Sequence, residues 1–400
     1  NFRVIIMKKW PLSTISAVAD VFDGPHATPK TIDHGAIFLG IDSLDHGRLN
    51  LSSTRHVTNE DFKKWTKRVK PEAGDIVFSY ETRLGEVAII PEGLVCCLGR
   101  RMALIRTDRS VLNEKFFLYY FMSPQFQEQI RKNTINGATV DRIPLKDFPS
   151  FKLELPPLDE QHTIASILGS LDDKIELNRR MNETLEAMVR AMFRDWFVDF
   201  GPTRTKMAGE APYLAQELWE LFPDRLDDEE KPAGWLDGTL EDIANLQNGY
   251  AFKSSDWLVD GIPVVKIGAV KPSVVDLKNV SFVDSKFLKE KQNFILKSGD
   301  ILIGLTGYVG EVGRVPPSQL TPMLNQRVAR FLPGPSFYAY IFCVGRQKEF
   351  KEFVENQAHG SAQANVSTKD VLTYPIVIPT TNLSALFDEN VALILRRVVS

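Results

Sequence analysis

The stretch PDRLDDEEK, which begins at Pro223, contains the residue types that many nucleases use for metal-dependent hydrolysis. In such an enzyme the carboxylates of Asp224 and Glu229 would hold a divalent metal on neighbouring strands, with Lys231 beside them. Here the three residues lie within one nine-residue stretch of an acidic segment, and that segment has no strand pattern. We therefore expect a solvated acidic connector at this place, with a nuclease site as the alternative.

Other catalytic signatures are missing from the sequence. It contains no GxxxxGK[ST] phosphate loop, no HExxH helix, no CxxC pair and no GxSxG elbow. Its two Pro-Pro pairs lack the aromatic residue of the (N/D)PP(Y/F) stretch found in DNA amino-methyltransferases. The six histidines are scattered, and the three cysteines cannot build a disulfide framework, which fits a reducing cytoplasm. We expect a chain without catalytic, metal or membrane-spanning sites.

A long duplication organises the chain. GDIVFSYETRLGEVAIIP, from Gly74, returns 225 positions later as GDILIGLTGYVGEVGRVP, from Gly299. Three further pairs of segments repeat in the same order at offsets of 223 to 226. Four matched blocks at nearly one offset indicate a duplicated domain of roughly 150 residues, too long for a solenoid repeat. Glycines 85 and 310, at the same place in the two copies, are expected to be turn residues.

Each copy shows short β-rich runs punctuated by Gly and Pro, followed by one helix, which predicts an α+β domain with a curved sheet. The expected strands are AIFLGI (36–41), DIVFSY (75–80), EVAII (86–90) and MALIR (102–106), and in the second copy PVVKIG, DILIGL and RVARFL. The expected helices cover Asn113–Lys132 and Phe337–Val354.

Between the copies lies a helical pattern whose apolar positions alternate steps of four and three, the seam of a coiled coil. Asp159 is the expected N-cap and Gly201-Pro202 the expected stop. A related segment from Leu383 is the expected partner helix. Two asparagines within the seam are either a weak spot or a device that fixes register, and both interpretations stay open. The seam residues are Ile164, Leu168, Leu171, Ile175, Asn178, Asn182, Leu185, Val189, Met192 and Trp196.

These segments resemble the specificity subunit of type I restriction–modification systems. The resemblance rests on GDILIGLTGYVGEVG, NQRVARF, GSAQANVSTKD, LPPLDEQHTIASILGSLDDKIELNRRMNETLEAM and MFRDWFVDF, which together span nearly the whole chain. It implies two tandem target-recognition domains separated by long helices that form an antiparallel coiled coil. On this basis we expect domains at 11–157 and 235–380, a spacer helix at 158–200, an acidic connector at 201–234, and the start of a longer distal helix at 381–400.

The resemblance also implies a function and partners. The chain would be a non-catalytic reader of a bipartite, asymmetric DNA target, working in the cytoplasm with methyltransferase subunits, two per chain, and with restriction subunits. S-adenosylmethionine, ATP and magnesium would bind those partners and not this chain. Two alternatives are a fused restriction–methylation enzyme and a coiled-coil scaffold that binds no DNA. The first lacks the required motifs, and the second does not need two domains with diverged polar loops.

Four loops in each copy carry side chains suited to DNA contact. Arg, Asn and Gln can pair with base edges, whereas Lys, Arg, Ser and Thr suit phosphates. The predicted DNA-contact residues are His26, Lys30, Tyr80, Thr82, Arg83, Arg101, Thr139 and Arg142 in the first copy, and Tyr250, Lys253, Ser254, Thr306, Tyr308, Arg327, Ser361, Gln363 and Asn365 in the second. Trp196 and Phe197 are expected in a core, with a docking face for a partner as the alternative.

Overall fold

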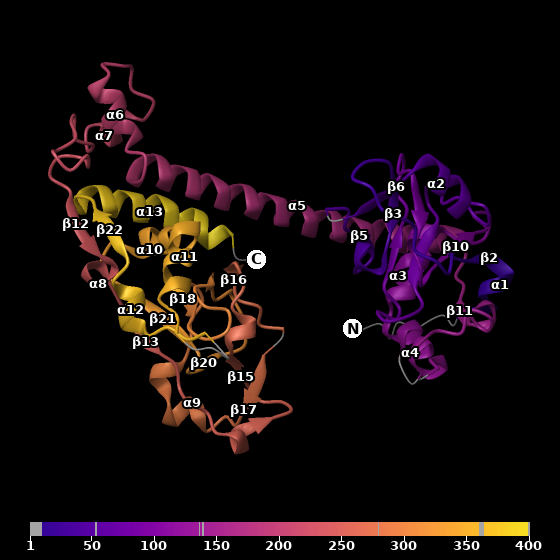
Figure 1. Ribbon diagram of the computed structural model, residues 1–400. Helices are drawn as coiled ribbons and strands as arrows, with labels where there is room; N and C mark the ends of the chain where they lie inside the picture. Colours follow the sequence, from indigo (N-terminus) through magenta and orange to yellow (C-terminus); the bar gives the residue numbers. More distant parts are fainter. Residues whose placement is uncertain are drawn as a thin grey trace, which may run out of the picture. The chain divides into compact units, whose positions relative to one another are not determined.

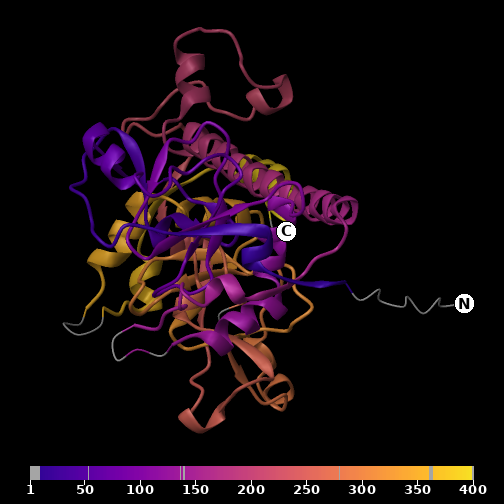
Figure 2. The ribbon, with the colours of Figure 1, turned by 90° about the vertical axis from the view of Figure 1, so that its right-hand side faces the viewer.

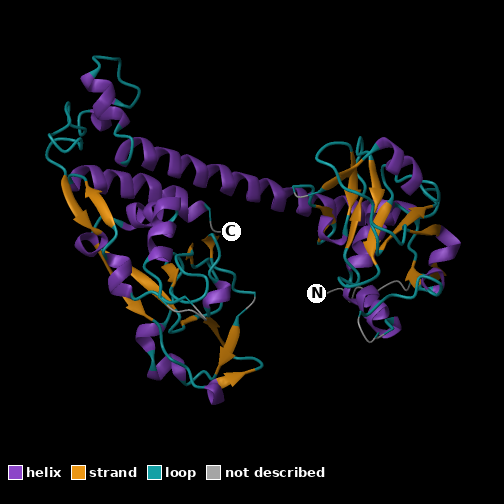
Figure 3. Ribbon diagram, viewed as in Figure 1, coloured by secondary structure: helices purple, strands orange, loops and turns teal. Residues whose placement is uncertain are grey.

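The computed structural model describes residues 10–52, 54–135, 137, 140–278, 280–359 and 364–398. The chain forms two compact units, of which the first ends at Ile175 and the second begins at Glu176. Figure 1 labels the elements of both units, and Figure 3 distinguishes their helices from their strands. None of the helices in the described ranges is long and apolar enough to cross a membrane.

The first unit is built on a four-stranded antiparallel sheet in the order β2-β10-β7-β8. Five of the six side chains of its central strand, MALIRT, are buried, because this strand is covered on both faces. A second sheet, β6-β3-β9, has one antiparallel and one parallel pair. The strands are β1 (Leu12–Thr14), β2 (Ala19–Asp23), β3 (Ala36–Leu39), β4 (Leu44–Asp45), β5 (Arg48–Leu49), β6 (Arg55–Val57), β7 (Ile76–Ser79), β8 (Val87–Ile89), β9 (Cys96–Leu98), β10 (Met102–Thr107) and β11 (Lys152–Glu154).

A cluster of phenylalanines fixes the helices of this unit on the sheet. Phe78 of β7 stacks on Phe148 with ring centroids 4.8 Å apart, and Phe121 lies 5.5 Å from Phe78. The helices are α1 (Ile15–Val18), α2 (Asn59–Trp65), α3 (Glu114–Met122) and α4 (Pro124–Asn133), with short 3-10 turns η1 (Ile41–Ser43) and η2 (Phe148–Ser150).

The single helix predicted for Asn113–Lys132 is wrong, because the structure has two. Ser123 adopts an extended backbone between α3 and α4, and its hydroxyl accepts a hydrogen bond from the Phe126 N–H. Pro124 then occupies the first turn of α4, where its missing N–H costs nothing. The apolar periodicity continues across this break, so periodicity alone does not reveal it.

The second unit repeats this plan. Its main sheet has the order β13-β21-β18-β19-β16, and a smaller sheet has the order β14-β17-β15-β20. The strands are β12 (Leu236–Thr239), β13 (Ala244–Asn248), β14 (Trp257–Leu258), β15 (Ile262–Val265), β16 (Ser273–Val274), β17 (Ser281–Val283), β18 (Ile301–Gly304), β19 (Val312–Arg314), β20 (Met323–Leu324), β21 (Val328–Pro333) and β22 (Pro375–Ile378).

The helices of the second unit show a similar break. The helix predicted for Phe337–Val354 is also two helices, because α10 ends at Gly345 and the extended backbone of Gln347 separates it from α11. The helices are α6 (Gly201–Met207), α7 (Gln216–Trp219), α8 (Leu240–Ile243), α9 (Phe287–Glu290), α10 (Tyr338–Gly345), α11 (Lys348–Asn356), α12 (Thr368–Leu372) and α13 (Thr381–Arg397), with 3-10 turns η3 (Ser254–Asp256), η4 (Ile267–Ala269) and η5 (Gln292–Phe294).

The backbone geometry confirms the duplication. Strands β2, β10, β7 and β8 pair in the same antiparallel order as β13, β21, β18 and β19, and β3 and β15 each pair in parallel with one further strand. Gly85 and Gly310 both have φ of +76°, a left-handed conformation that a side chain would strain. The predicted turn role of these two glycines is therefore confirmed.

The helix between the copies is the longest element. Helix α5 (Leu158–Phe197) is continuous over 40 residues, about 60 Å. The helix starts at Leu158, so Asp159 lies within its first turn. The prediction that Asp159 is the N-cap is therefore wrong. The carboxylate next to the positive end of the helix dipole is still favourable. Gly201 and Pro202 do not simply stop the helix, since they form the first turn of α6.

Part of the predicted seam is buried against α13. Phe387 of α13 has its ring centroid 5.6 Å from that of Trp196 and 4.9 Å from that of Phe197, and Val189 belongs to the same core. Helix α13 runs alongside the last turns of α5 in both views (Figures 1 and 2). The predicted partner helix and the core position of Trp196 and Phe197 are thereby confirmed.

The upstream seam positions have a different environment. Leu171 and Ile175 are 53% and 63% exposed, Asn178 is exposed and Asn182 is half-buried. Leu185 and Met192 are half-buried in the second unit, and Ile164 and Leu168 are half-buried in the first. Neither asparagine is enclosed in an apolar layer, so the described chain does not provide the buried environment that the register interpretation requires.

Candidate nucleic-acid interface

In the first unit, four loops meet at one edge of the main sheet, which we name loop edge 1. Strand β2 ends at Asp23 opposite Ala103, and β7 ends at Ser79 opposite Met102, the first residue of β10. The loops 24–30, 80–86 and 99–101 therefore leave the sheet on the same side. The fourth loop joins them because the Ile143 N–H donates to the Tyr80 carbonyl oxygen at 2.8 Å.

The second unit builds loop edge 2 with the same hydrogen bonds. The Leu305 N–H donates to the Arg327 carbonyl at 3.0 Å, as the Tyr80 N–H donates to the Arg101 carbonyl at 3.1 Å. The Val366 N–H donates to the Leu305 carbonyl at 3.0 Å, as Ile143 does to Tyr80. The loops 249–256, 305–311 and 325–327, together with the described residues 359 and 364–366 of the fourth loop, thus correspond to those of loop edge 1. The framework is shared, and only the side chains on it differ.

Several predicted residues of loop edge 1 present exposed side chains. His26 is 66% exposed, with its Nε2 2.8 Å from an Asp23 carboxylate oxygen, and Lys30 and Arg142 are exposed. Arg142 lies in bridges with both Glu81 and Ile135, which brings the fourth loop to the turn after β7. Thr139 lies outside the described residues.

Other predicted residues of loop edge 1 hold the loops together. Tyr80 is only 6% exposed, and burial followed by the neighbouring Asp23 raises its pKa above the usual value. Arg83 donates through Nη1 to the Ile41 and Leu44 carbonyls at 3.2 and 3.1 Å, so its guanidinium ties two loops together. This gives Arg83 a structural duty that its sequence context does not reveal.

Arg101 and Thr82 form a paired turn. Both have left-handed backbones, with φ of +72° and +69°. The Arg101 guanidinium donates to the Thr82 hydroxyl at 3.1 Å and lies 3.1 Å from a Glu81 carboxylate oxygen. The strain of two non-glycine residues in this region is characteristic of binding and catalytic loops.

At loop edge 2 the exposed residues include Lys253, Ser254, Arg327 and Asn365. Tyr308 is 65% exposed at the tip of the turn after β18, with the Lys271 ammonium 5.8 Å from its ring centroid. Ser361 and Gln363 lie outside the described residues.

Two predicted residues of loop edge 2 have internal partners. The Thr306 hydroxyl donates to the Asn365 side-chain oxygen at 2.6 Å across a bridge between two loops. Tyr250 packs on Phe252 with ring centroids 5.0 Å apart, and the Lys291 ammonium lies 4.8 Å from its centroid. These contacts make the two residues part of the loop framework.

Sequence reasoning missed two residues beside loop edge 2, Lys266 and Trp257. The Lys266 ammonium lies 3.5 Å from the centroid of the Trp257 ring. The two residues are nine positions apart, and the first copy has Gly40 where Lys266 stands, so the repeat gave no reason to single them out. The unusual signal was a lysine directly after the buried run PVV, where apolar residues dominate.

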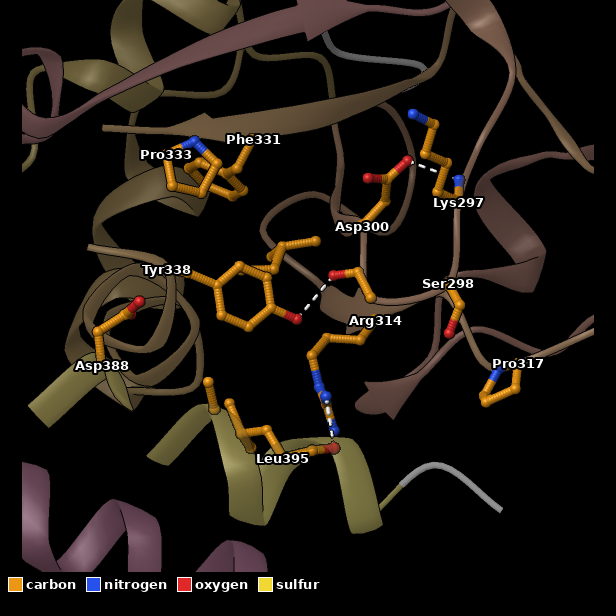
Figure 4. Close-up of a pocket in the computed structure, with 13 residues that line it drawn as sticks. Lys297, Ser298, Asp300, Arg314, Pro317, Phe331, Pro333, Tyr338, Asp388 and Leu395 are labelled. Carbon is orange, nitrogen blue, oxygen red and sulfur yellow. Dashed lines mark hydrogen bonds between the residues drawn. The ribbon is translucent and has the colours of Figure 1, made fainter. Parts of the chain in front are cut away.

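At the opposite edge of this sheet lies a cavity of about 470 Å³, near the start of β18 and the end of β19 (Figure 4). Arg314 is 1% exposed there, donates to the Leu395 carbonyl of α13 at 2.8 Å and lies 4.9 Å from the Phe342 ring centroid. The Tyr338 hydroxyl donates to the Gly299 carbonyl at 2.7 Å. These bonds tie α10 and α13 to the sheet, far along the strands from loop edge 2.

The described residues offer little for catalysis. They contain no cluster of three or more His, Cys, Asp or Glu side chains placed to hold a metal ion. All three cysteines are free and buried, and burial raises the pKa of Cys96 and of Cys97 to about 12, so neither thiol is a ready nucleophile.

The PDRLDDEEK segment is a structural connector. The Lys231 ammonium is 2.9 Å from carboxylate oxygens of Asp227 and of Asp237 and also contacts Glu229, and only 10% of the Lys231 side chain is exposed. The prediction of a merely solvated loop is therefore wrong in one respect, because a buried lysine organises it. Asp224 is exposed and outside this cluster, so the three residues of the nuclease pattern do not converge.

Comparisons with known proteins identify the family. The type I restriction modification DNA specificity domain matches residues 15–187 and 232–396, the two copies of the duplication. The chain belongs to this family. Its members recognise DNA and have no catalytic centre of their own, which agrees with the expected non-catalytic DNA reader.

Curated relatives and a solved structure agree with this assignment. The chain is 24% identical to the type I restriction enzyme MjaVIII specificity subunit of Methanocaldococcus jannaschii over 81% of this chain and 72% of that protein. It is 24% identical to the MjaIX specificity subunit of the same organism over 94% of this chain and 84% of the relative. The S subunit of the type I system of M. genitalium has a similar fold, with a TM-score of 0.55, 16% identity and coverage of 99% of this chain and 92% of that one.

Proposed function

We propose that each loop edge reads one half of a bipartite, asymmetric DNA target. The observation that carries this proposal is the repeated loop framework, in which the same backbone hydrogen bonds hold different side chains. Glu81, Arg83 and Arg142 stand at loop edge 1 where Thr306, Tyr308 and Asn365 stand at loop edge 2. A shared framework with diverged donors and acceptors suits two readers of different sequences.

The contact residues divide by their geometry. The exposed side chains of His26, Lys30, Arg142, Lys253 and Tyr308 are free to approach DNA in the groove or at the backbone. The tied or buried side chains, such as Tyr80 and Arg83, would act by holding the loops in position. Thr139, Ser361 and Gln363, on the same loops, remain proposed contacts.

The long helices provide a surface for partner subunits. Leu171, Ile175 and Met181 of α5 are 53%, 63% and 49% exposed, and a partner subunit would cover these apolar side chains. We place methyltransferase subunits, two per chain, along α5 and α13, with restriction subunits joining them in the cytoplasm. S-adenosylmethionine, ATP and magnesium would be bound by those subunits.

The proposal is tested by selection on random DNA. The chain would be assembled with its methyltransferase subunits, and the methylated sequences recovered from a random library. Two short half-sites of different sequence, separated by a gap of unspecified bases, are the expected result. A single continuous target, or two identical half-sites, would contradict the proposal.

A further inference from the structure

Beside loop edge 2 lies a small cleft with two positive charges. Its volume is about 290 Å³, and its lining residues are Phe252, Trp257, Lys266, Ile267, Asn325, Gln326 and Arg327. Lys266 directly follows β15, and the Asn325 N–H donates to the Val265 carbonyl at 3.2 Å. This hydrogen bond places the segment of Arg327 next to Lys266.

The ammonium of Lys266 is held in place. It sits 3.5 Å from the Trp257 ring centroid, close enough for a strong cation–π interaction, which fixes the side chain at the cleft. Burial, and secondly the charge of Arg327, lower the pKa of Lys266. The two cations are thus near enough to repel one another.

No counter-charge compensates this pair within the described ranges. The ion pairs found there include none for Lys266 or Arg327, although other basic residues of the unit, such as Arg330 and Arg346, have carboxylate partners within 4 Å. Two cations beside one cleft without an anion raise the local potential and favour an anionic ligand.

Loop edge 1 is built differently at the equivalent place. Arg101 corresponds to Arg327 and has Glu81 at 3.1 Å, whereas the residue corresponding to Glu81 is Thr306, which bonds to Asn365. Gly40, which precedes η1 as Lys266 precedes η4, carries no charge. The first unit therefore neutralises this position from within, and the second leaves it positive.

We propose that the cleft of Lys266, Trp257 and Arg327 binds one phosphate group of the DNA backbone and sets the register of the second unit on its half-site. The inference rests on the proposed DNA-reading function of loop edge 2. A phosphate between the two cations would supply the missing negative charge and accept hydrogen bonds from both. Trp257 acts as a positioning residue, because it orients the ammonium and does not itself carry charge.

The salt dependence of binding tests this inference. The assembled complex would be titrated with target and non-target duplexes at several salt concentrations, using wild type and the Lys266→Ala, Arg327→Ala double variant. Each phosphate contact contributes about 0.9 to the slope of log affinity against log salt. Loss of one phosphate should lower the slope by about 0.9, so that between 50 and 200 mM salt the affinity of the variant falls about 3.5-fold less than that of wild type.

Controls separate the possible outcomes. Lys297→Ala removes an exposed lysine from the opposite edge of the same sheet, before β18 begins, and should leave the slope unchanged. Trp257→Leu should weaken binding to target and non-target DNA alike while the recognised sequence stays the same. Thermal melting of each variant checks that the unit remains folded.

Two results would overturn the inference. An unchanged slope with an altered recognised sequence would mean that Lys266 and Arg327 read base edges. An unchanged slope and unchanged affinity in the folded double variant would mean that the cleft does not contact DNA. Failure of the proposed function would give a different result, because the wild-type complex itself would then show no preference for a target.

Discussion

Phe387 is the residue on which the packing of α13 against α5 depends most. Its side chain is fully buried, and its ring centroid lies 4.9 Å from that of Phe197, 5.6 Å from that of Trp196 and 6.0 Å from that of Phe193. Phe387→Ala would leave a cavity among three aromatic rings of α5. Substitutions of this kind cost about 3–5 kcal/mol, a large part of the roughly 5–15 kcal/mol that stabilises a typical domain.

Hydrogen exchange measures this loss of stability separately in the two units. We expect exchange protection to fall by about 3–5 kcal/mol in β21 of the second unit and to stay unchanged in β10 of the first. Leu393→Ala is the matched control, because Leu393 lies on the same helix but is 57% exposed. In this variant the exchange protection of β21 should fall by less than about 1 kcal/mol. Equal losses in the two variants, or a Phe387→Ala loss below about 1 kcal/mol, would refute the assignment of α13 to this core.

Three further predictions concern the connector and the long helix. Asp224→Ala combined with Glu229→Ala should leave DNA cleavage by the assembled complex intact, and loss of cutting with binding preserved would restore the nuclease interpretation. Deleting residues 178–184 removes one heptad, about 10.5 Å of α5, and should shorten the gap between half-sites by about three base pairs in methylation mapping; an unchanged gap would assign the spacing to partner subunits. The neighbouring lysine lowers the pKa of Asp227, so its stabilisation is present above the unfolded-state pKa of about 3.9 and is lost as the pH falls below it. Hydrogen exchange of the connector between pH 6 and pH 3 should show this loss, and constant protection would contradict it.

The duplication allowed much of the fold to be predicted. Gly74, Gly85, Gly299 and Gly310 fix turns with left-handed backbones, and such positions are visible in sequence because few other residues tolerate them. The strands between these glycines are strongly apolar, with little alternation of apolar and polar residues, so the existence of the strands was predictable as well. Since the same strands end at the same edge in each copy, the loops predicted to carry the DNA contacts do converge.

The breaks in the helices and the duties of individual side chains were not predictable to the same degree. Ser123 and Pro124 end one helix and start another without changing the apolar pattern. Arg83 forms hydrogen bonds with carbonyls about 40 positions away, and such long-range partners leave no local signal. The pairing of Lys266 with Trp257 likewise depends on tertiary contacts, and it has no counterpart in the first copy to suggest it.

The central claim is that each loop edge reads its own half-site. Replacing exposed side chains at one loop edge with alanine tests this claim most directly. One complex would carry Lys253→Ala with Tyr308→Ala at loop edge 2, and another His26→Ala with Thr82→Ala at loop edge 1, and the methylated positions of both would be mapped on random DNA. Each pair should relax one half-site only, by about 5- to 150-fold for each side chain that no longer pairs with a base, and the two pairs should affect different halves. Relaxation of both half-sites by either pair, or of neither half-site by both pairs, would contradict the account.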